Sequence, residues 1–305
     1  MSKQAVIICH NLYEDLRAAI QACPHDKLFI LVDEHTQKLC LPLISGFEYL
    51  KEAYIITIGA EDVHKNIETL AYVWKELGEH GATRHSLMIN LGGGMVTDLG
   101  GFAASTFKRG IKYINIPTTL LAMVDASVGG KTGINFNGLK NEIGVFSPAQ
   151  YVLIDTEFLK SLDSQNLLSG YAEMLKHGII STTEHWAELL NFDMNHIDYK
   201  ALQALVAKSV QIKEDIVEQD PFEKGIRKAL NLGHTAGHAF ESLALESSHP
   251  VLHGYAVAWG IVCELYLSFC KVGFPKDKLR QTVQFIKDHY GMLPFDCKQY
   301  DRLYE

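Results

Sequence analysis

The chain has 305 residues, of which 28 are Lys or Arg and 36 are Asp or Glu, giving a formal net charge of −8. This length predicts about two domains, because single hydrophobic cores stop growing at roughly 250–300 residues. The acidic balance gives no reason to expect nucleic acid or an anionic membrane as a partner. It remains compatible with a small anionic substrate held in a local basic pocket.

The opening residues, MSKQAVIICHNLYEDL, hold only a short apolar run and lack the pattern of a secretory signal. No stretch of the sequence approaches the roughly 18 apolar residues of a membrane span. The six cysteines form no CxxC pair. We therefore expect a cytoplasmic protein with reduced thiols and no membrane partner.

Short apolar runs alternate with amphipathic segments, such as residues 62–80, through the first half of the chain. This alternation predicts a parallel sheet covered by helices, and ligands bind at the carboxyl ends of the strands in such sheets. The predicted strands are residues 5–9, 27–32, 53–58, 86–91, 111–116 and 151–154.

After about residue 155, longer segments with a helical period replace the strand-like runs. The predicted helices are residues 164–180, 183–192, 198–219, 227–246, 254–272 and 275–291. The expected organisation is an α/β nucleotide-binding domain with a parallel sheet over residues 1–155. An all-α domain over residues 156–305 follows it.

The stretch LMINLGGGMVTDLGG joins a predicted strand to a predicted helix through Gly92, Gly93 and Gly94. Glycines at such a turn let backbone N–H groups approach a phosphate at the helix N-terminus. We favour this phosphate site over a plain glycine turn, although the spacing is not the GxGxxG of the Rossmann fingerprint. Asp33 ends an earlier apolar run, where a carboxylate either accepts hydrogen bonds from ribose or caps a helix.

The stretch IPTTLLAMVDASVGGKTGINFNGLKNEIG predicts a long loop in which lysines alternate with glycines and small residues. Long loops in compact domains are usually functional, and lysine ammonium groups suit phosphate. We favour a functional loop over a solvated surface loop. Its polar candidates are Thr118, Thr119, Asp125, Lys131, Lys140 and Asn141.

The motif LNLGHTAGH places His234 and His238 four residues apart, which stacks both rings on one face of a helix. Either both histidines bind a metal, or one does and the other has a different role. The motif lacks the glutamate of HExxH, so the base of a metalloprotease is missing. Gly233 and Gly237 are poor helix formers and indicate close approach of another segment to this backbone.

Two further polar residues lie on otherwise apolar helical segments. Glu173 lies in SGYAEMLKHGII, three residues before Lys176, and His253 lies just ahead of an apolar helix. Two histidines and a glutamate with an open fourth position are the ligand set of a catalytic zinc. The alternative for each histidine is an ordinary core or surface residue.

Five ordered blocks identify a family when they are taken together. They are GGGMVTDLGGFAASTFKRG, IPTTLLAMVDASVGGKTGIN…GLKNEIG, SGYAEMLKHGII, GIRKALNLGHTAGHAFE and HPVLHGYAVAWG. The sequence resembles 3-dehydroquinate synthase from about Asp33 to the helix after His253. The resemblance implies the dehydroquinate synthase-like fold, NAD, a divalent metal, usually Zn²⁺ with Co²⁺ as an alternative, and a homodimer.

The resemblance also implies roles for individual residues. The metal ligands match Glu173, His234 and His253, whereas His238 faces the substrate. Positions that contact NAD match Asp33, Asp62, Lys65, Gly93, Gly94, Asp98, Thr118, Thr119, Lys131, Lys140, Phe158 and Ser161. The substrate pocket matches Arg109, Lys131, Lys140, Asn141, Lys213, Arg227 and Asn231, with Arg109 reaching the substrate phosphate of the neighbouring subunit. The catalytic positions match Lys176, His238, Asp125 and Glu223.

The reaction implied by the resemblance converts 3-deoxy-D-arabino-heptulosonate 7-phosphate to 3-dehydroquinate and phosphate. It proceeds by transient oxidation with NAD, elimination of phosphate, re-reduction and an intramolecular aldol closure. NAD is recycled, so the net reaction is that of a carbon–oxygen lyase acting on a small sugar-acid phosphate. The reaction belongs to the shikimate pathway of aromatic amino acid biosynthesis.

Two departures from the family pattern leave alternatives open. Glu61 stands where the family has glycine in a Gly-Glu-x-x-Lys turn, with Asp62 as the acid. Family members also continue past YDRLYE through a basic segment that helps to hold the substrate phosphate, so a truncated homologue of low activity is one alternative. The others are another sugar-phosphate cyclase and a metal-dependent NAD polyol dehydrogenase. Four retained residues favour dehydroquinate synthase: Asn141, Lys213, Arg227 and Asn231.

Overall fold

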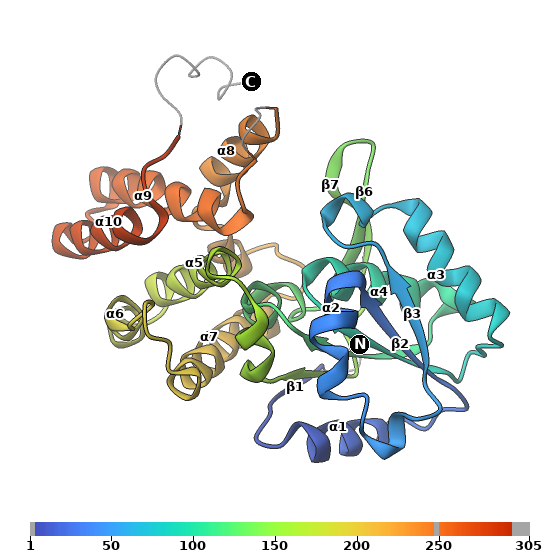
Figure 1. The fold of residues 1–305 in the computed structure, drawn as a ribbon. Coiled ribbons are helices and arrows are strands. Elements are labelled where there is room, and N and C mark those ends of the chain that lie inside the picture. Colours follow the sequence, from blue (N-terminus) through green and yellow to red (C-terminus); the bar gives the residue numbers. More distant parts are fainter. Residues whose placement is uncertain (1–3, 247–249, 295–305) are drawn as a thin grey trace. The chain divides into compact units, whose positions relative to one another are not determined.

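The computed structural model describes residues 4–246 and 250–294 (Figure 1). The chain divides into two compact units, Met1–Leu162 and Asp163–Glu305. The first unit is α/β, and the second is helical over its described residues, as the sequence predicts. The predicted boundary between residues 155 and 156 precedes the short helix Thr156–Ser161, which belongs to the first unit.

A six-stranded parallel sheet with the order β1-β8-β5-β4-β2-β3 forms the centre of the first unit. Its strands are β1 (Ala5–Ile8), β2 (Leu28–Asp33), β3 (Tyr54–Ile58), β4 (Leu87–Gly92), β5 (Lys112–Pro117) and β8 (Tyr151–Ile154). These are the six strands predicted from apolar runs. Every residue of β2 and β4 is buried, which explains why both strands read as continuous apolar runs.

Two adjacent glycines let helix α4 (Gly94–Thr106) pack closely, Gly100 against the central sheet and Gly101 against residue 132, which follows β5 in the chain. A Cβ atom on Gly100 would lie 2.2 Å from Asn90 Oδ1, and one on Gly101 would lie 2.5 Å from Thr132 Cγ2. Helix α3 begins after Asn66, whose side chain caps it, so the first residues of the predicted segment 62–80 precede the helix. The helices of this unit are α1 (Leu12–Gln21), α2 (Glu34–Leu39), α3 (Ile67–Glu79) and α4 (Gly94–Thr106).

An antiparallel hairpin of β6 (Lys131–Phe136) and β7 (Leu139–Phe146) lies against α4 (Figure 1). The sequence predicts a loop over residues 116–144, and this prediction is wrong for the strand residues 131–136 and 139–144. All eight residues of β7 are exposed, so the strand has no buried face to give it a regular apolar alternation. A π-helical turn, Ala122–Ala126, precedes the hairpin. The hairpin therefore gives fixed positions to Lys131, Lys140 and Asn141.

Short helical turns connect several of these elements in both units. The 3₁₀ helices are Leu41–Leu43, Glu48–Leu50, Asp62–His64, Phe107–Arg109, Thr156–Ser161 and Ile226–Asn231. The first of them has Pro42 at its start, where a missing backbone N–H costs nothing. Asp155 caps the fifth, because its side chain accepts a hydrogen bond from Glu157 N.

The second unit contains α5 (Ser164–Ile180), α6 (Thr183–Asn191), α7 (Tyr199–Gln219), α8 (His234–Glu246), α9 (His253–Val272) and α10 (Lys276–Tyr290). Asp163, Thr182 and Asp198 cap the first three, since each side chain accepts a hydrogen bond from a first-turn amide. These caps explain why the predicted starts of the three helices are accurate. Helix α9 packs against α5, α8 and α10.

The helix predicted over residues 227–246 is interrupted, so this prediction is wrong in its continuity. A 3₁₀ helix, Ile226–Asn231, precedes the break, and α8 begins at His234. Gly233 lies between them with φ +83°, a left-handed conformation that glycine adopts readily. A Cβ atom at Gly233 would lie 2.8 Å from the backbone oxygen of Val257, so the turn also needs glycine for close approach of α9.

One described helix, α9, is long and apolar enough to cross a membrane when only length and composition are considered. The helix contains Glu264 and Lys271, so it is not an uninterrupted apolar run, and a single helix of this kind is weak evidence for a membrane span. A core helix has the same properties, and Ala256, Trp259 and Ile261 are buried within the helical unit. Helix α9 contacts three other helices of this unit, α5, α8 and α10.

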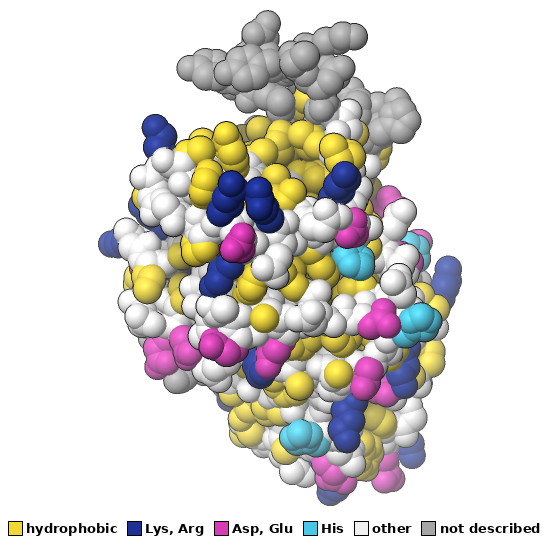
Figure 2. All heavy atoms as spheres, turned by 90° about the vertical axis from the view of Figure 1, so that its left-hand side faces the viewer, with side chains coloured by type: hydrophobic (Ala, Val, Ile, Leu, Met, Phe, Trp, Pro, Cys, Tyr) yellow, Lys and Arg dark blue, Asp and Glu magenta, His cyan; other side chains and the backbone are white. Residues whose placement is uncertain are grey.

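Apolar side chains of α9, such as Tyr266 and Leu267, are also exposed. Val262, Tyr266, Leu279 and Val283 line an open groove between α9 and α10. Figure 2 shows one face of the molecule, on which hydrophobic side chains lie among charged ones. This groove is separate from the residues that the sequence predicts to bind ligands.

Candidate active site

The sheet order places a ligand-binding position between β2 and β4. These strands are neighbours, but the chain continues from β2 to β3 on one side and from β4 to β5 on the other. Ligands bind in parallel sheets at the carboxyl ends of strands where the order reverses in this way. Asp33 ends β2, Gly92 ends β4, and Thr118 follows β5, so the three lie along this edge.

The glycine turn after β4 leaves the start of α4 open to a ligand. Gly93 occupies the N-cap position, and among the described residues no side chain caps the helix. The N-terminus of a 13-residue helix carries unpaired N–H groups and a partial positive charge, which suit phosphate. Thr118 N donates to Gly92 O at 3.0 Å, and a Cβ on Gly93 would lie 3.0 Å from Thr119 Cγ2. These residues fit a dinucleotide pyrophosphate.

Asp33 caps a helix, which was one of the two roles that its position allows. Its Oδ1 accepts hydrogen bonds from His35 N at 2.8 Å and Thr36 N at 2.7 Å. Both cap hydrogen bonds go to Oδ1, so the position of Oδ2 is compatible with accepting a hydrogen bond from a ribose hydroxyl group. Ser161 donates to the backbone oxygen of the buried Phe158 at 3.0 Å, within the helix Thr156–Ser161.

Lys65 joins several of the predicted ligand-contacting residues into one network. Its ammonium group lies 2.6 Å from Asp98 Oδ2 and 2.5 Å from Asn141 Oδ1, although Lys65 is only 5% exposed. Lys140 Nζ lies 3.9 Å from Asp62 Oδ2. The turn at residues 62–65 thus contacts the hairpin through Lys140 and Asn141, and it contacts α4 through Asp98.

Asn135 completes this network, and sequence reasoning missed it. Its side chain donates to Asp62 Oδ2 at 3.0 Å and accepts from Asn141 N at 2.9 Å. Its backbone N–H donates to Lys65 O at 2.8 Å. The hairpin geometry creates these contacts, and the sequence pattern gave no signal for the hairpin.

The other predicted residues of this unit lie at its loops. Lys131 begins β6 and is exposed, and Asp125 lies in the π-helical turn. Arg109 is exposed and has φ +68°, directly after Lys108 with φ +48°. Two successive left-handed residues other than glycine are costly and are typical of functional loops.

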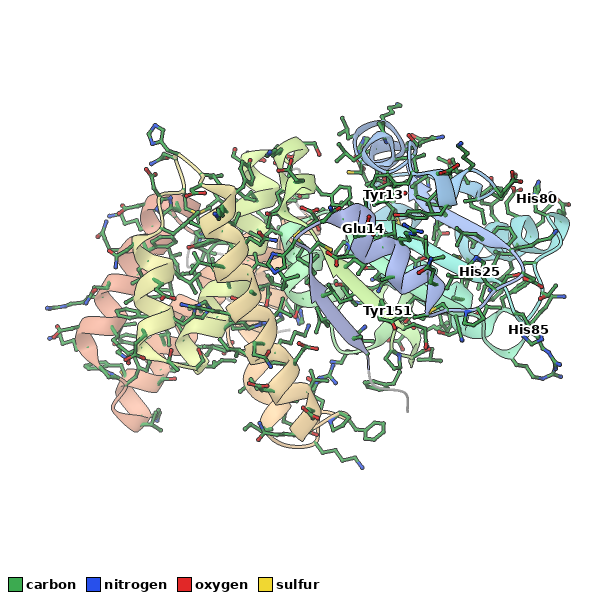
Figure 3. The ribbon with its side chains drawn as sticks, turned by 90° about the horizontal axis from the view of Figure 1, so that it is seen from below. Tyr13, Glu14, His25, His80, His85 and Tyr151 are labelled. Carbon is green, nitrogen blue, oxygen red and sulfur yellow. The ribbon has the colours of Figure 1, made fainter. Side chains whose placement is uncertain are left out.

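Several histidines of the first unit lie away from this ligand-binding edge. Figure 3 labels His25, His80 and His85, of which His25 and His85 precede β2 and β4 at the amino-terminal ends of the strands. The His80 ring stacks on Tyr54 with 3.6 Å between ring centroids. These three histidines are therefore not part of the predicted ligand-binding edge, and His80 has a packing role against Tyr54.

In the helical unit, Glu173, His234 and His253 converge from α5, α8 and α9. The Nε2 atoms of His234 and His253 lie 3.5 Å and 3.7 Å from Glu173 Oε1. That oxygen is fully buried and has no hydrogen-bond partner among the described residues. An unsatisfied buried oxygen facing two imidazole nitrogens fits a cation, and these three ligand types match a catalytic zinc site with an open position.

The other oxygen of Glu173 contacts the ammonium group of Lys176, one turn along α5. Both side chains are almost completely buried. Burial opposes ionisation of Glu173, but Lys176 and the two facing histidines hold its pKa well below the usual range. Glu173 is therefore a carboxylate, the form that a metal requires.

The second nitrogen of each histidine also has a partner. His253 Nδ1 lies 3.2 Å from Glu241 Oε2, and His234 Nδ1 lies 3.3 Å from Leu232 O. Burial by itself lowers the pKa of His253, but Glu173 and Glu241 outweigh burial and raise that pKa to about 9. His238 is exposed, and its ring centroid lies 5.3 Å from that of His234.

Comparison with known proteins places the chain in a family. Residues 55–169 match the family described as 3-dehydroquinate synthase N-terminal, and residues 170–305 match its C-terminal counterpart. The chain is 55% identical over 305 residues to the 3-dehydroquinate synthase of Parabacteroides distasonis, covering 100% of this chain and 86% of that protein. The chain belongs to the 3-dehydroquinate synthase family.

Solved structures show that the fold is dehydroquinate synthase-like. The 2-epi-5-epi-valiolone synthase of Streptomyces hygroscopicus, with NAD⁺ and Zn²⁺ bound, is 25% identical with a TM-score of 0.86, covering 100% of this chain and 85% of that one. A 2-deoxy-scyllo-inosose synthase complexed with carbaglucose-6-phosphate, NAD⁺ and Co²⁺ is 22% identical with a TM-score of 0.86, covering 99% and 83%. The predicted fold class is confirmed, and these two neighbours carry NAD⁺ with a divalent metal.

The remaining predicted residues of this family member lie around the 3₁₀ helix Ile226–Asn231. Arg227 is buried, and its Nη1 donates to Pro221 O at 2.7 Å. Asn231 donates to Glu223 Oε1 at 2.7 Å, and both line an open groove in the helical unit. Lys213 is buried on α7.

Two carboxylates near the metal candidates were missed by sequence reasoning. Glu264 of α9 accepts hydrogen bonds from Gly233 N at 2.8 Å and Thr235 N at 3.1 Å, at the start of α8. Glu241 contacts His253, as described above. Glu241 had a signal in the sequence, because it follows His234 by seven residues and therefore shares its helix face. Glu264 had none.

Proposed function

We infer that the chain converts 3-deoxy-D-arabino-heptulosonate 7-phosphate to 3-dehydroquinate and phosphate, in the shikimate pathway, with NAD and Zn²⁺ or Co²⁺. The observation that carries this inference is the convergence of His234 and His253 on one oxygen of Glu173, which has no hydrogen-bond partner among the described residues. It occurs in a chain that is 55% identical over its length to a 3-dehydroquinate synthase. We place the enzyme in the cytoplasm.

The metal would be held by Glu173, His234 and His253. When bound, it supplies a Lewis acid that lowers the pKa of a coordinated hydroxyl group. Lys176 offsets the charge of Glu173 through the carboxylate oxygen that does not face the histidines. Lys176 and His238 would orient substrate hydroxyls and move protons.

NAD would bind at the carboxyl edge of β2 and β4. The backbone amides at Gly93 and Gly94, at the start of α4, would bind its pyrophosphate, and Asp33 would accept from a ribose hydroxyl. NAD, when bound, supplies a reversible hydride acceptor. The remaining residues proposed to contact NAD are Asp62, Lys65, Asp98, Thr118, Thr119, Lys131, Lys140, Phe158 and Ser161.

The substrate carries a carboxylate and a phosphate, which require cationic partners. We propose Lys131, Lys140 and Asn141 from the first unit and Lys213, Arg227 and Asn231 from the second as its binding residues. Asp125 and Glu223 would act near the reacting centre. Arg109, exposed on its left-handed turn, would reach the substrate phosphate of a second subunit in a homodimer.

The direct test is release of inorganic phosphate from the heptulosonate phosphate by the purified chain with NAD⁺ and Zn²⁺. We expect phosphate release without net accumulation of NADH, because NAD is recycled. Steady accumulation of NADH would indicate a polyol dehydrogenase instead. Turnover of sedoheptulose 7-phosphate or glucose 6-phosphate in place of the heptulosonate would indicate a different cyclase. No release with either metal would exclude the proposed activity.

A further inference from the structure

Glu241 lies on α8 and reaches a histidine of the neighbouring helix. Its Oε2 is 3.2 Å from His253 Nδ1, and the residue is only 6% exposed. Burying a carboxylate is costly unless a charged or hydrogen-bonding partner compensates for the lost water. The imidazole of His253 is such a partner. The contact therefore compensates for the burial of Glu241.

The two nitrogens of His253 face two different carboxylates. Nδ1 faces Glu241, and Nε2 faces Oε1 of Glu173 at 3.7 Å. A carboxylate that accepts from one ring N–H fixes the tautomer and leaves the lone pair on the opposite nitrogen. Once a metal replaces the proton on Nε2, a hydrogen bond from Nδ1 to Glu241 keeps the Nε2 lone pair facing the metal position beside Glu173.

His234 reaches the same cluster with a different support. Its Nδ1 lies 3.3 Å from the backbone oxygen of Leu232, in the turn just before its own helix. That support is part of the backbone and persists when side chains are substituted. His253 is the first residue of α9, and its support is a side chain that belongs to another helix. A single substitution at Glu241 can therefore remove the partner that orients His253, whereas no side-chain substitution removes the backbone partner of His234.

The packing of α8 against α9 makes this support available. A Cβ on Gly260 would lie 2.0 Å from Gly233 O, and one on Gly237 would lie 3.0 Å from Ala256 O. Glycine at these positions lets the two helix backbones come into contact. At this separation, a glutamate on α8 reaches the imidazole of the residue that begins α9.

We propose that Glu241 is a positioning residue of the metal site, which accepts a hydrogen bond from Nδ1 of His253 and so holds Nε2 ready for the metal. Glu241 acts through His253 and is not itself a ligand. This inference rests on the proposed metal site of Glu173, His234 and His253. It adds a residue that is absent from the ligand set implied by the family.

The experiment measures Co²⁺ affinity of the metal-free full-length chain by competition with a chelator, together with the visible absorption of the bound Co²⁺. The variants are Glu241→Ala, which removes the acceptor, and Glu241→Gln, whose amide oxygen still accepts from Nδ1. Glu184→Gln, an exposed carboxylate on α6, is the matched control. Thermal unfolding of each metal-free variant reports whether the fold is retained.

We expect Glu241→Ala to weaken Co²⁺ binding by about 10–100-fold, the usual effect of losing such a partner. Glu241→Gln should lie between Ala and the unchanged chain, and Glu184→Gln should bind as the unchanged chain does. Unaltered affinity in Glu241→Ala would overturn the proposal. Equal complete loss in both Glu241 variants would also overturn it, since that result indicates a ligand or a purely structural residue. Failure of the unchanged chain to bind Co²⁺ or Zn²⁺ would overturn the metal site itself.

Discussion

His234 and His238 lie one turn apart on α8, and their surroundings differ. His234 Nε2 faces the buried oxygen of Glu173, whereas His238 is exposed. We expect His234→Ala to lose bound metal and activity together. His238→Ala should retain metal and lose about 10²–10⁴-fold in turnover, the usual contribution of an acid–base group. Metal content per chain and phosphate release measure the two effects, and equal metal loss in both variants would assign both histidines to the metal.

Glu61 has a backbone conformation that is normally reserved for glycine. Its φ is +72° and its ψ is 161°, a region where side chains other than hydrogen are strained by about 1–3 kcal/mol. The resemblance places a glycine at this position in the family. We expect Glu61→Gly to stabilise the first unit by about 1 kcal/mol, because relief of strain exceeds the entropic cost of glycine. Denaturant midpoints measure this, and a lower midpoint for the variant would refute the strain argument.

His185 makes stability dependent on pH. Burial lowers the pKa of its imidazole in the folded chain, where Nε2 contacts Ser209 Oγ at 3.1 Å. The unfolded chain therefore takes up the proton at a higher pH, near the ordinary value of about 6.5. Stability falls as pH decreases from that value toward the folded pKa, since the unfolded state binds more protons.

Replacement of this histidine by glutamine should remove that contribution. We expect His185→Gln to be less stable at neutral pH but to lose less stability on acidification than the unchanged chain. Urea unfolding at several pH values on either side of about 6.5 measures both slopes. Parallel pH dependences would show that His185 titrates alike in both states.

At the scale of elements, the start of α8 depends on α9. Gly233 offers no capping side chain, and Glu264 accepts from the amides of Gly233 and Thr235 instead. We expect Glu264→Ala to cost about 1 kcal/mol, the usual value of a helix cap. It should also weaken metal binding, because His234 is the first residue of this helix. Denaturant unfolding measures the loss of stability, and Co²⁺ titration measures metal affinity, with Glu184→Ala as the control for both. If Glu264→Ala changes neither the stability nor the affinity, water replaces the carboxylate at the start of the helix.

The elements that the sequence predicted well are those with a strong burial pattern. The central strands β2 and β4 are buried on both faces, and their apolar runs identify them. Strand β7 is exposed throughout, so its residues carry no such pattern. The break at Gly233 depends on contact with α9, which local periodicity does not contain. Tertiary contacts therefore decide the parts that sequence reasoning missed.

The same distinction applies to the site. The i,i+4 spacing pointed to His234 and His238, and the glycine turn pointed to the start of α4. The contacts of Lys65 with Asp98 and Asn141 join segments distant in sequence, so only the family resemblance suggested Lys65 and Asp98, whereas the loop pattern had already indicated Asn141. Glu264 caps a helix from another helix, and no local motif marks such a residue.

At the scale of the whole molecule, the two cofactors are assigned to different compact units. The residues proposed for NAD extend from Asp33 to Ser161 in the first unit, whereas Glu173, His234 and His253 belong to the second. A ligand stabilises the state that it binds by RT ln(1 + [L]/Kd), about 2.7 kcal/mol at 100 times Kd. Each cofactor alone should therefore protect mainly the unit that contains its residues.

Hydrogen exchange measured peptide by peptide checks this assignment. At 100 times Kd, Zn²⁺ alone should slow exchange up to about 100-fold in α5, α8 and the start of α9, where opening exposes the ligands. NAD⁺ alone should slow exchange at the β4–α4 turn and around Thr118. His234→Ala should abolish the effect of Zn²⁺ and leave that of NAD⁺. Slower exchange in the sheet with Zn²⁺, with exchange in α5 and α8 unchanged, would place the metal site in the first unit. The reason is that an ion stabilises mainly the folded segments that bind it.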